Sequence, residues 1–458
     1  MSKGNEQDSI EIKSENNQTQ SKLPSTFRAL KHRNFQFFFG GQFISLTGTW
    51  MQTVAESWLI YRLTGSVVLL GLVRFASQIP VFLLAPIGGA VADRFNRRKI
   101  LIATQTWAMT LAFILAMLVL TGNIKEWHLF VIAALLGLGN AFDIPTRQAF
   151  VADMVGREDL LNAIALNSSM FNGARIIGPA IAGLLVAAVG EGWCFLFNAL
   201  SYVAVITGFL LMNVKVEIRP RVGSTVSNIA EGFKFVAKTP PIRALLLLLG
   251  LVSLMGMPYS VLMPIIADKF LGGGSDTLGY LMGASGVGAL IAALVLASRK
   301  QVFGLGRWVN FASAGFGIFL IVFSFSRSFW LSMILLLPIG FSMMTQMSSS
   351  NTLIQAMVPD ELRGRVMSVY SMMFMGMAPI GALLSGWLAE YIGTTETIAL
   401  GGAACILGAI IFGWRLPSLR GEARRMIVAL QMTAGAPASK ASFQEPPMMT
   451  GEVSIKTN

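Results

Sequence analysis

The chain has 458 residues and a net charge of +12, and it is 54% hydrophobic but only 13% charged. Soluble domains average about a quarter charged residues, so this composition excludes an ordinary soluble protein. A basic chain could bind nucleic acid, but most of the Lys and Arg residues here lie in the loops and end segments that flank the apolar runs. We therefore expect the lipid bilayer, with its anionic headgroups, as a partner and no nucleic acid.

Twelve apolar runs are each long enough to cross a bilayer as one helix. Lipid offers no hydrogen-bond partners to the backbone, and the runs lack the alternation of barrel strands, so helix is the expected structure. The predicted spans are 36–60, 67–91, 100–121, 128–149, 163–189, 193–213, 242–267, 277–297, 307–325, 329–350, 366–392 and 397–414.

The longest loop separates six of these spans from the other six, which predicts an all-α membrane protein in two six-helix halves. The expected regions are a disordered cytoplasmic tail at 1–34, the first half at 35–213, a cytoplasmic linker at 214–241, the second half at 242–415 and a second cytoplasmic tail at 416–458. Residues 1–34 have no apolar core, so they do not form a cleavable signal peptide.

The basic residues are distributed unevenly between the two sides of the predicted bundle. If the N-terminus is inside, the loops on the outer side carry only Arg62, Lys125, Lys269 and Arg327. This asymmetry follows the positive-inside rule and predicts that both termini are cytoplasmic.

The first span carries a polar stripe. Its members are three or four residues apart and share one helical face: Gln42, Ser45, Thr49, Gln52 and Glu56. Because a polar face toward lipid is costly, the stripe either lines a water-filled cavity or meets polar groups of other helices.

A charged turn, GGAVADRFNRRK, follows the second span. Arg98 and Lys99 suit a topology anchor. Asp93 adds nothing to such a signal, and a carboxylate there would favour the N-terminus of a helix.

Two stretches of the chain are related by a gapless repeat, which covers a loop and the span that follows it. Residues that match at one constant offset include Glu158 with Glu361, Gly173 with Gly376, Gly178 with Gly381 and Gly183 with Gly386. Two parallel six-span halves are typical of transporters that alternate access around a central site.

The charged turn resembles the signature loop of the major facilitator superfamily. The match is carried by Gly89, Asp93, Arg94, Arg97 and Arg98. Asn96 stands where the family usually has glycine, and asparagine tolerates the left-handed conformation of a tight turn.

Residues 49–66 and 142–150 resemble a bacterial exporter branch of that superfamily, which includes siderophore and multidrug efflux proteins. The resemblance implies a proton-driven, monomeric exporter of the bacterial inner membrane. It also implies a cytoplasmic gate, with Asp93 near residues 364–366 and Arg97 near Asp143 or Asp153, which releases when the halves rock.

Five charged side chains lie at membrane depth within predicted spans, all in the first half: Glu56, Arg74, Asp143, Arg147 and Arg175. Such groups are usually functional at membrane depth. The spans of the second half carry charges only at their ends, such as Asp268 and Glu390. Asp143 and Glu56 are the candidates for carrying a coupling proton, because burial and a nearby arginine act on a carboxylate in opposite directions.

Pairing of these charges is open at the level of sequence. Glu56 and Arg74 could pair near the outer side, and Arg175 needs Asp143, Glu56 or the substrate as an anionic partner. Asp143 and Arg147 are four residues apart and form either a functional or a purely structural pair, with Asn140 on the same face as a candidate cavity residue.

The fifth span contains Gly173, Gly178, Pro179 and Gly183. Small residues let helices approach closely, and proline removes a backbone donor. This run resembles the motif that distinguishes exporters from importers in the superfamily.

Neither a phosphate-binding loop nor a metal-ligand spacing occurs in the sequence, so we expect no ATP-driven pump, enzyme, metal or cofactor. The predicted function is secondary active transport, namely proton-coupled export of a small organic molecule such as a drug-like compound or a siderophore. The alternative is an importer or a lipid-moving facilitator with the same fold.

Overall fold

The structure is a computed structural model that describes residues 25–214, 225–299, 302 and 304–433. The first half contains η1 (Ser25–Lys31), α1 (Arg33–Thr64), α2 (Val67–Arg94), α3 (Arg97–Leu120), α4 (Glu126–Val189) and α5 (Glu191–Leu211). The linker contains α6 (Thr225–Lys238). The second half contains α7 (Pro240–Leu251), η2 (Val252–Gly256), η3 (Met257–Ser260), α8 (Met263–Ile265), η4 (Ile266–Phe270), α9 (Ser275–Ala297), α10 (Leu305–Ser324), α11 (Phe329–Met357), α12 (Asp360–Ile392) and α13 (Thr394–Thr433).

Eleven segments of the described chain are long and apolar enough to cross a membrane, and no strand occurs among the described residues, so the all-α membrane fold is confirmed. Two of these segments lie within α4, which breaks at Gly156, where φ is +73°. The helix α1 is long enough but is not among the eleven. Its polar stripe lowers its hydropathy, so the number twelve rests on α1 and stays a prediction.

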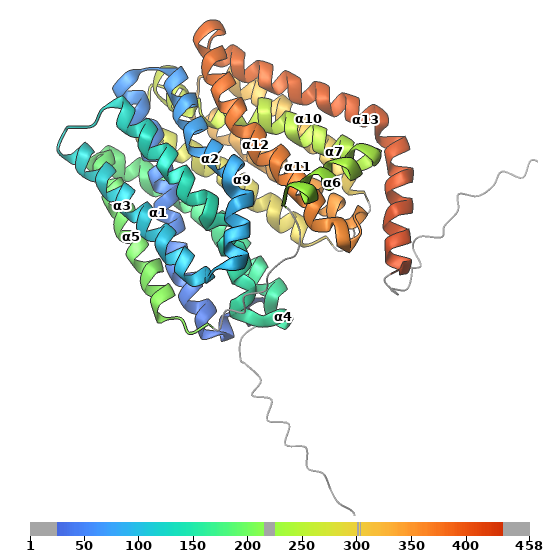
Figure 1. The fold of residues 1–458 in the computed structure, drawn as a ribbon. Coiled ribbons are helices and arrows are strands. Elements are labelled where there is room, and N and C mark those ends of the chain that lie inside the picture. Colours follow the sequence, from blue (N-terminus) through green and yellow to red (C-terminus); the bar gives the residue numbers. More distant parts are fainter. Residues whose placement is uncertain (1–24, 215–224, 300–301, 303, 434–458) are drawn as a thin grey trace, which may run out of the picture.

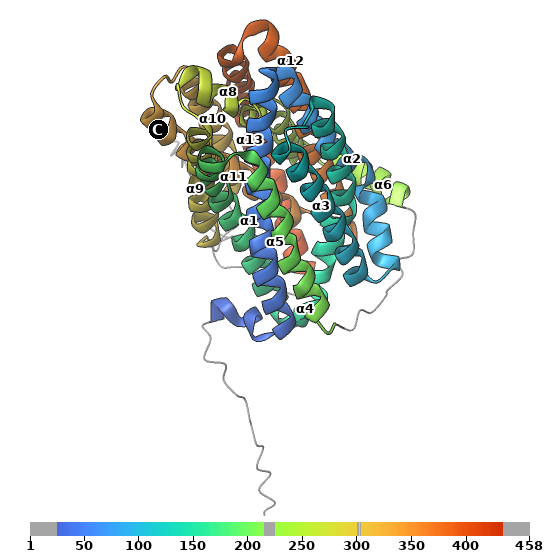
Figure 2. The same ribbon diagram turned by 90° about the vertical axis from the view of Figure 1, so that its left-hand side faces the viewer.

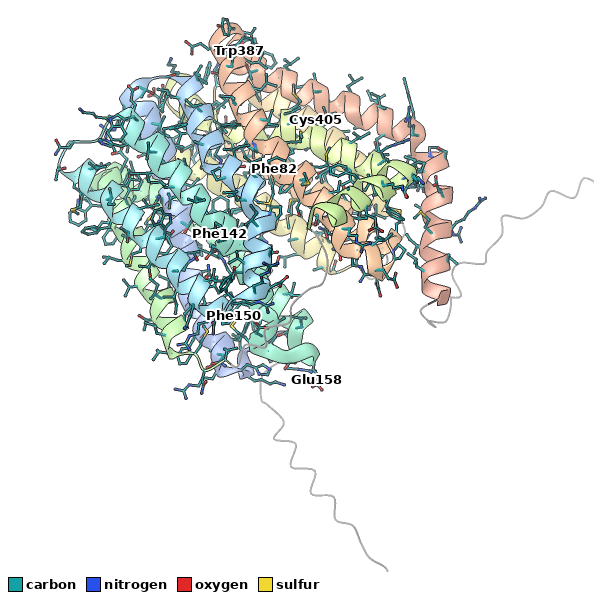
Figure 3. All side chains as sticks on the ribbon, in the orientation of Figure 1. Phe82, Phe142, Phe150, Glu158, Trp387 and Cys405 are labelled. Atoms are coloured by element: carbon teal, nitrogen blue, oxygen red, sulfur yellow. The ribbon has the colours of Figure 1, made fainter. Side chains whose placement is uncertain are left out.

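The chain passes back and forth between two ends of the bundle. We call one the linker end, which holds the turns at 95–96, 156–158 and 358–359, and the other the far end, which holds the turns at 65–66, 121–125, 271–274 and 325–328. In Figure 3, Glu158 marks the linker end and Trp387 lies near the far end. Figure 1 shows two lobes that converge at the far end and diverge toward the linker end.

Two helix pairs make most of the contacts between the halves, α2 with α12 and α4 with α9. Glycines make both contacts close. A methyl group on Gly386 would approach the Val67 carbonyl oxygen of α2 to 2.9 Å, and one on Gly183 would approach the Ser275 carbonyl oxygen of α9 to the same distance. At the linker end, by contrast, a methyl group on Gly364 would meet no atom within 4 Å.

The repeat in the sequence corresponds to equivalent contacts in space. Gly178 packs on α1 and its partner Gly381 packs on η2 and η3, so each joins helices within one half. Gly183 and its partner Gly386 both contact the opposite half. Gly173 and Gly376 differ, because Gly376 lies against Phe82 of α2, whereas Gly173 meets only a side chain of its own half.

The expected tails and linker contain more helix than the sequence indicated. Residues 25–31 form η1, residues 225–238 form α6, and α13 continues to Thr433. The expectation of disorder is therefore wrong for residues 25–34, where Ala29 is buried, and residues 416–433 pack on the second half instead of forming a separate tail, because Leu419 and Ile427 are buried. Residues 1–24, 215–224 and 434–458 lie outside the described residues.

Candidate transport site and gates

The charged turn brings three helices of the first half together. Arg97, at the start of α3, donates from Nη1 to both carboxylate oxygens of Asp153 on α4, at 3.0 and 2.9 Å. Its Nη2 lies 3.3 Å from Oδ1 of Asp93 on α2. The predicted contact of Arg97 with Asp153, one of the two alternatives, is confirmed.

Two residues of the turn make contacts that the sequence did not indicate. Arg98 donates to the Phe209 and Leu210 carbonyl oxygens at 2.6 and 2.7 Å, so it caps the C-terminus of α5 as well as adding charge. Asn96 is the N-cap of α3, with φ −65° and its side chain accepting from the Lys99 N–H, so it is not left-handed. Arg94 is exposed at the end of α2.

Asp93 does not reach the second half in this structure. Its carboxylate faces Arg97, while Arg365 on α12 pairs with Glu231 of α6 at 2.7 Å. The expected proximity of Asp93 to residues 364–366 is therefore absent, because the halves diverge at the linker end. Gly89, one turn earlier on α2, lies beside Pro145 of its own half.

Asp143 is buried and surrounded by donors from its own half. Its Oδ1 accepts from Thr104 at 2.9 Å and from Gln105 at 2.7 Å, and its Oδ2 is paired with Arg147 one turn along α4. The ion pair of Asp143 with Arg147 is confirmed, and Arg175 is not among the donors that its carboxylate meets in the described structure. Pairing and hydrogen bonds of this kind offset the burial of the charge, and they fit both alternatives, a functional pair and a purely structural one.

Glu56 has a different environment. It interacts electrostatically with Arg74 of α2, as expected, but the two groups are not in direct contact. Among the described residues, Glu56 has no hydrogen-bond donor. Within the spans of the first half, it is thus the carboxylate whose charge is least compensated by direct contacts.

Arg175 lies at the boundary between the halves. Its backbone lies beside Gly286 of α9, and its guanidinium interacts electrostatically with Tyr259 of η3, whose hydroxyl is 2.9 Å from the Ser285 hydroxyl of α9. The sequence offered three anionic partners for this guanidinium, namely Asp143, Glu56 and the substrate. Neither carboxylate pairs with it in the described structure, so an anionic substrate stays a prediction.

The polar stripe of α1 divides into two groups. Gln42, Ser45 and Gln52 are buried, and Gln52 accepts from Asn198 of α5 at 2.6 Å. Helices α1 and α5 run side by side (Figure 2), so Gln52 meets a polar neighbour of another helix. The side-chain oxygen of Gln42 has no partner among the described residues, and for Gln42 and Ser45 both alternatives stay predictions. Thr49, 3.4 Å from the Tyr202 hydroxyl, is exposed. Asn140 on α4 is exposed as well.

A cluster of basic side chains around Asp159 was not predicted from the sequence. Three groups of the N-terminal segment, on Arg28, Lys31 and His32, lie 2.7, 2.8 and 2.8 Å from its carboxylate. Asp159 is 2% exposed and sits just after the Gly156 break of α4. Nothing in the local sequence indicates a contact across more than a hundred residues.

A second group that the sequence did not indicate is a set of buried polar side chains on α11. The hydroxyls of Thr345, Ser349 and Ser350 and the side-chain nitrogen of Gln346 have no partner among the described residues. The signal in the sequence was the polar run TQMSSS inside an apolar span.

Comparisons with known proteins agree with this architecture. The chain is 27% identical to the staphyloferrin A transporter of Staphylococcus aureus, over 82% of this chain and 95% of that protein. It is also 27% identical to the multidrug efflux pump Tap of Mycolicibacterium fortuitum, over 81% and 93% of the two chains. A third relative at 27% identity is the enterobactin exporter EntS of Shigella boydii, over 86% and 93%.

Solved transporters share the fold at lower identity. The nucleoside transporter NupG superposes with a TM-score of 0.65 at 13% identity, over 84% of this chain and 99% of that one. A peptide transporter of the POT family gives 0.70 at 12% identity, over 84% and 96%. The family model described as "Transmembrane secretion effector" matches residues 24–443. The protein is therefore a multi-pass membrane transporter rather than an enzyme, and it belongs to the transmembrane secretion effector family of the major facilitator type.

Proposed function

We propose that the protein exports a small organic molecule from the bacterial cytoplasm by alternating access, coupled to inward movement of protons. The observation that carries this proposal is the arrangement of the repeated glycines. Gly183 and Gly386 contact the opposite half toward the far end, while Asp93 and Gly364 at the linker end are apart. Repeated halves that pack at one end only are what a rocking mechanism requires.

We place the linker end in the cytoplasm. The basic residues of the charged turn, the linker and the end of α13 all lie on this side, in agreement with the positive-inside rule. Both termini are then cytoplasmic, the protein is a monomer of the inner membrane, and the structure corresponds to an inward-facing state. In the opposite state Asp93 meets residues 364–366 and closes the cytoplasmic side.

Glu56 is the better proton carrier of the two candidates. Protonation of Asp143 would weaken its hydrogen bonds from Thr104 and Gln105 and break its ion pair with Arg147. Protonation of Glu56 gives up only its longer-range attraction to Arg74. A site that must gain and lose a proton in each cycle should have a small difference in interaction free energy between its protonated and its ionised form, and Glu56 has the smaller one.

The substrate that suits this molecule carries a negative group. Arg175 lies between the halves, and no carboxylate of the described chain contacts it. A carboxylate or catecholate of the substrate would neutralise it, and Thr49 and Asn140 offer further polar contacts. The relatives named as transporting staphyloferrin A and enterobactin support a siderophore-like substrate, and the multidrug relative supports a drug-like one.

The test uses inverted membrane vesicles, in which export appears as uptake, with an imposed proton gradient and candidate siderophores or drugs as substrates. Glu56→Gln should abolish gradient-driven accumulation but keep downhill exchange. Asp143→Asn keeps an oxygen that can accept from Thr104 and Gln105 but loses the ion pair with Arg147, so this variant should mainly lose stability. Gradient-driven uptake that is unchanged in Glu56→Gln contradicts proton coupling through Glu56. Transport only in right-side-out vesicles supports the alternative of an importer.

A further inference from the structure

The far end of the bundle is held closed partly by polar contacts between the halves. The Tyr61 hydroxyl of α1 donates to Oδ2 of Asp268 in η4 at 2.6 Å, and the Ser275 hydroxyl of α9 donates to the Gly183 carbonyl oxygen of α4 at 3.4 Å. The first bond is short and charge-assisted, whereas the second is at the limit of hydrogen-bond length. The bond of Tyr61 to Asp268 is therefore the strong directional contact of the two.

The surroundings of the pair suit a bond that forms and breaks reversibly. Tyr61 is 7% exposed and its ring packs against Trp58 at a centroid distance of 6.0 Å, so its hydroxyl is held in place. Asp268 is exposed and lies in a π-helical turn, a feature common at functional sites. Because the carboxylate is hydrated, separation of the pair leaves no buried, unpaired charge.

The neighbouring residue makes a bond of similar length that does not cross between the halves. Arg62 donates to both carboxylate oxygens of Glu191 on α5, at 2.8 and 3.1 Å. Both residues belong to the first half, so this ion pair persists when the halves separate. Two adjacent positions on α1 thus offer a contact that depends on conformation and a matched one that does not.

We infer that Tyr61 and Asp268 form a latch that holds the far end closed. The inference rests on the proposed alternating access and adds the residues that set its balance. The bond exists only while the far ends of the halves are together, so its free energy favours that state alone. Its loss shifts the equilibrium toward the state that is open at the far end, about tenfold for a hydrogen bond to a charged group.

Distances between spin labels on the purified full chain in lipid nanodiscs test the latch. Labels at Asn123→Cys and Ser328→Cys, both exposed in far-end turns of opposite halves, report the separation, and Cys194 and Cys405 are replaced by alanine. Tyr61→Phe keeps the ring and removes the hydroxyl, and Asp268→Ala removes the acceptor. We expect either variant to raise the far-end-open population about tenfold and the double variant to raise it no further. Asp268→Asn keeps an acceptor and should shift the population less.

The control is Arg62→Gln, which should leave the distance distribution as in the parent. An unchanged distribution in Tyr61→Phe, with normal elution and thermal unfolding, overturns the latch, and so does an equal shift in Arg62→Gln. The variant Gly183→Ala distinguishes failure of the latch from failure of the proposed alternating access. If it opens the far end while Tyr61→Phe does not, only the latch is wrong. A single distance in every variant overturns alternating access, and the latch with it.

Discussion

Replacement of Gly183 by alanine should push the two halves apart at the far end. The added methyl group would lie 2.9 Å from the Ser275 carbonyl oxygen, 3.0 Å from the Gly279 Cα and 3.1 Å from the Asp276 Cα. Ordinary contacts of this kind begin at 3.4 Å, so α4 and α9 must separate by about 0.5 Å. All three neighbours are backbone atoms of a helix and cannot move aside as a side chain would.

The cost of such overpacking is about 1–3 kcal/mol. In the proposed alternating-access cycle this cost arises only in the state in which the far end is closed, so it should appear as a shift of about 5- to 150-fold toward the opposite state. Labels at Glu158→Cys and Glu361→Cys, exposed and repeat-equivalent residues of the linker end, measure the shift as a shorter distance. Gly386→Ala, the repeat partner, should act in the same direction.

Gly40→Ala is the matched control, because a methyl group there would meet no atom within 4 Å. Gly173→Ala is a control within the fifth-span motif, since its nearest neighbour is the edge of the Phe43 ring at 3.5 Å. The reasoning is refuted if Gly183→Ala gives the same distance distribution as these two variants.

Three further predictions concern stability within the first half. Gly178→Ala places a methyl group against the backbone of α1 in the same half. It should therefore reduce the free energy of unfolding by about 1–3 kcal/mol, seen as a lower unfolding temperature, without a change in the label distances. Asp143→Ala leaves Arg147 half-buried and unpaired, which should cost about 3–5 kcal/mol in thermal unfolding, and the double variant with Arg147→Leu should recover part of it. Asp159→Ala removes the carboxylate that holds η1, so trypsin should cleave within residues 25–31 faster than in the parent while the unfolding temperature changes little.

The sequence was sufficient for the features that depend on local pattern. Apolar runs give helices because lipid leaves the backbone no other partner, and the repeat gives two halves with equivalent contacts at Gly178 and Gly381. The pairing of Asp143 with Arg147 follows from their spacing on one helix. These inferences require no knowledge of how distant segments fold together.

Features that depend on distant segments or on conformation were missed. The cluster on Asp159 joins residues far apart in the chain, and exposed polar segments carry no periodic signal that would pair them. Asn96 can take either a left-handed turn or an N-cap, and only the direction of α3 decides between them. Gln52 on a polar stripe could meet water or another helix, and Asn198 on α5 settles the question.

The failure of Asp93 to meet residues 364–366 and the close packing of Gly183 and Gly386 have one common cause. The two sets of contacts lie at opposite ends of the bundle, and each half is tied together internally by contacts such as those of Gly178 and Gly381. If the halves move as rigid bodies, the far-end glycine contacts and the linker-end charge contact cannot form at the same time. A variant that weakens one set must then populate the other, so Gly183→Ala should bring Asp93 toward α12, and Asp93→Asn should favour the structure described here.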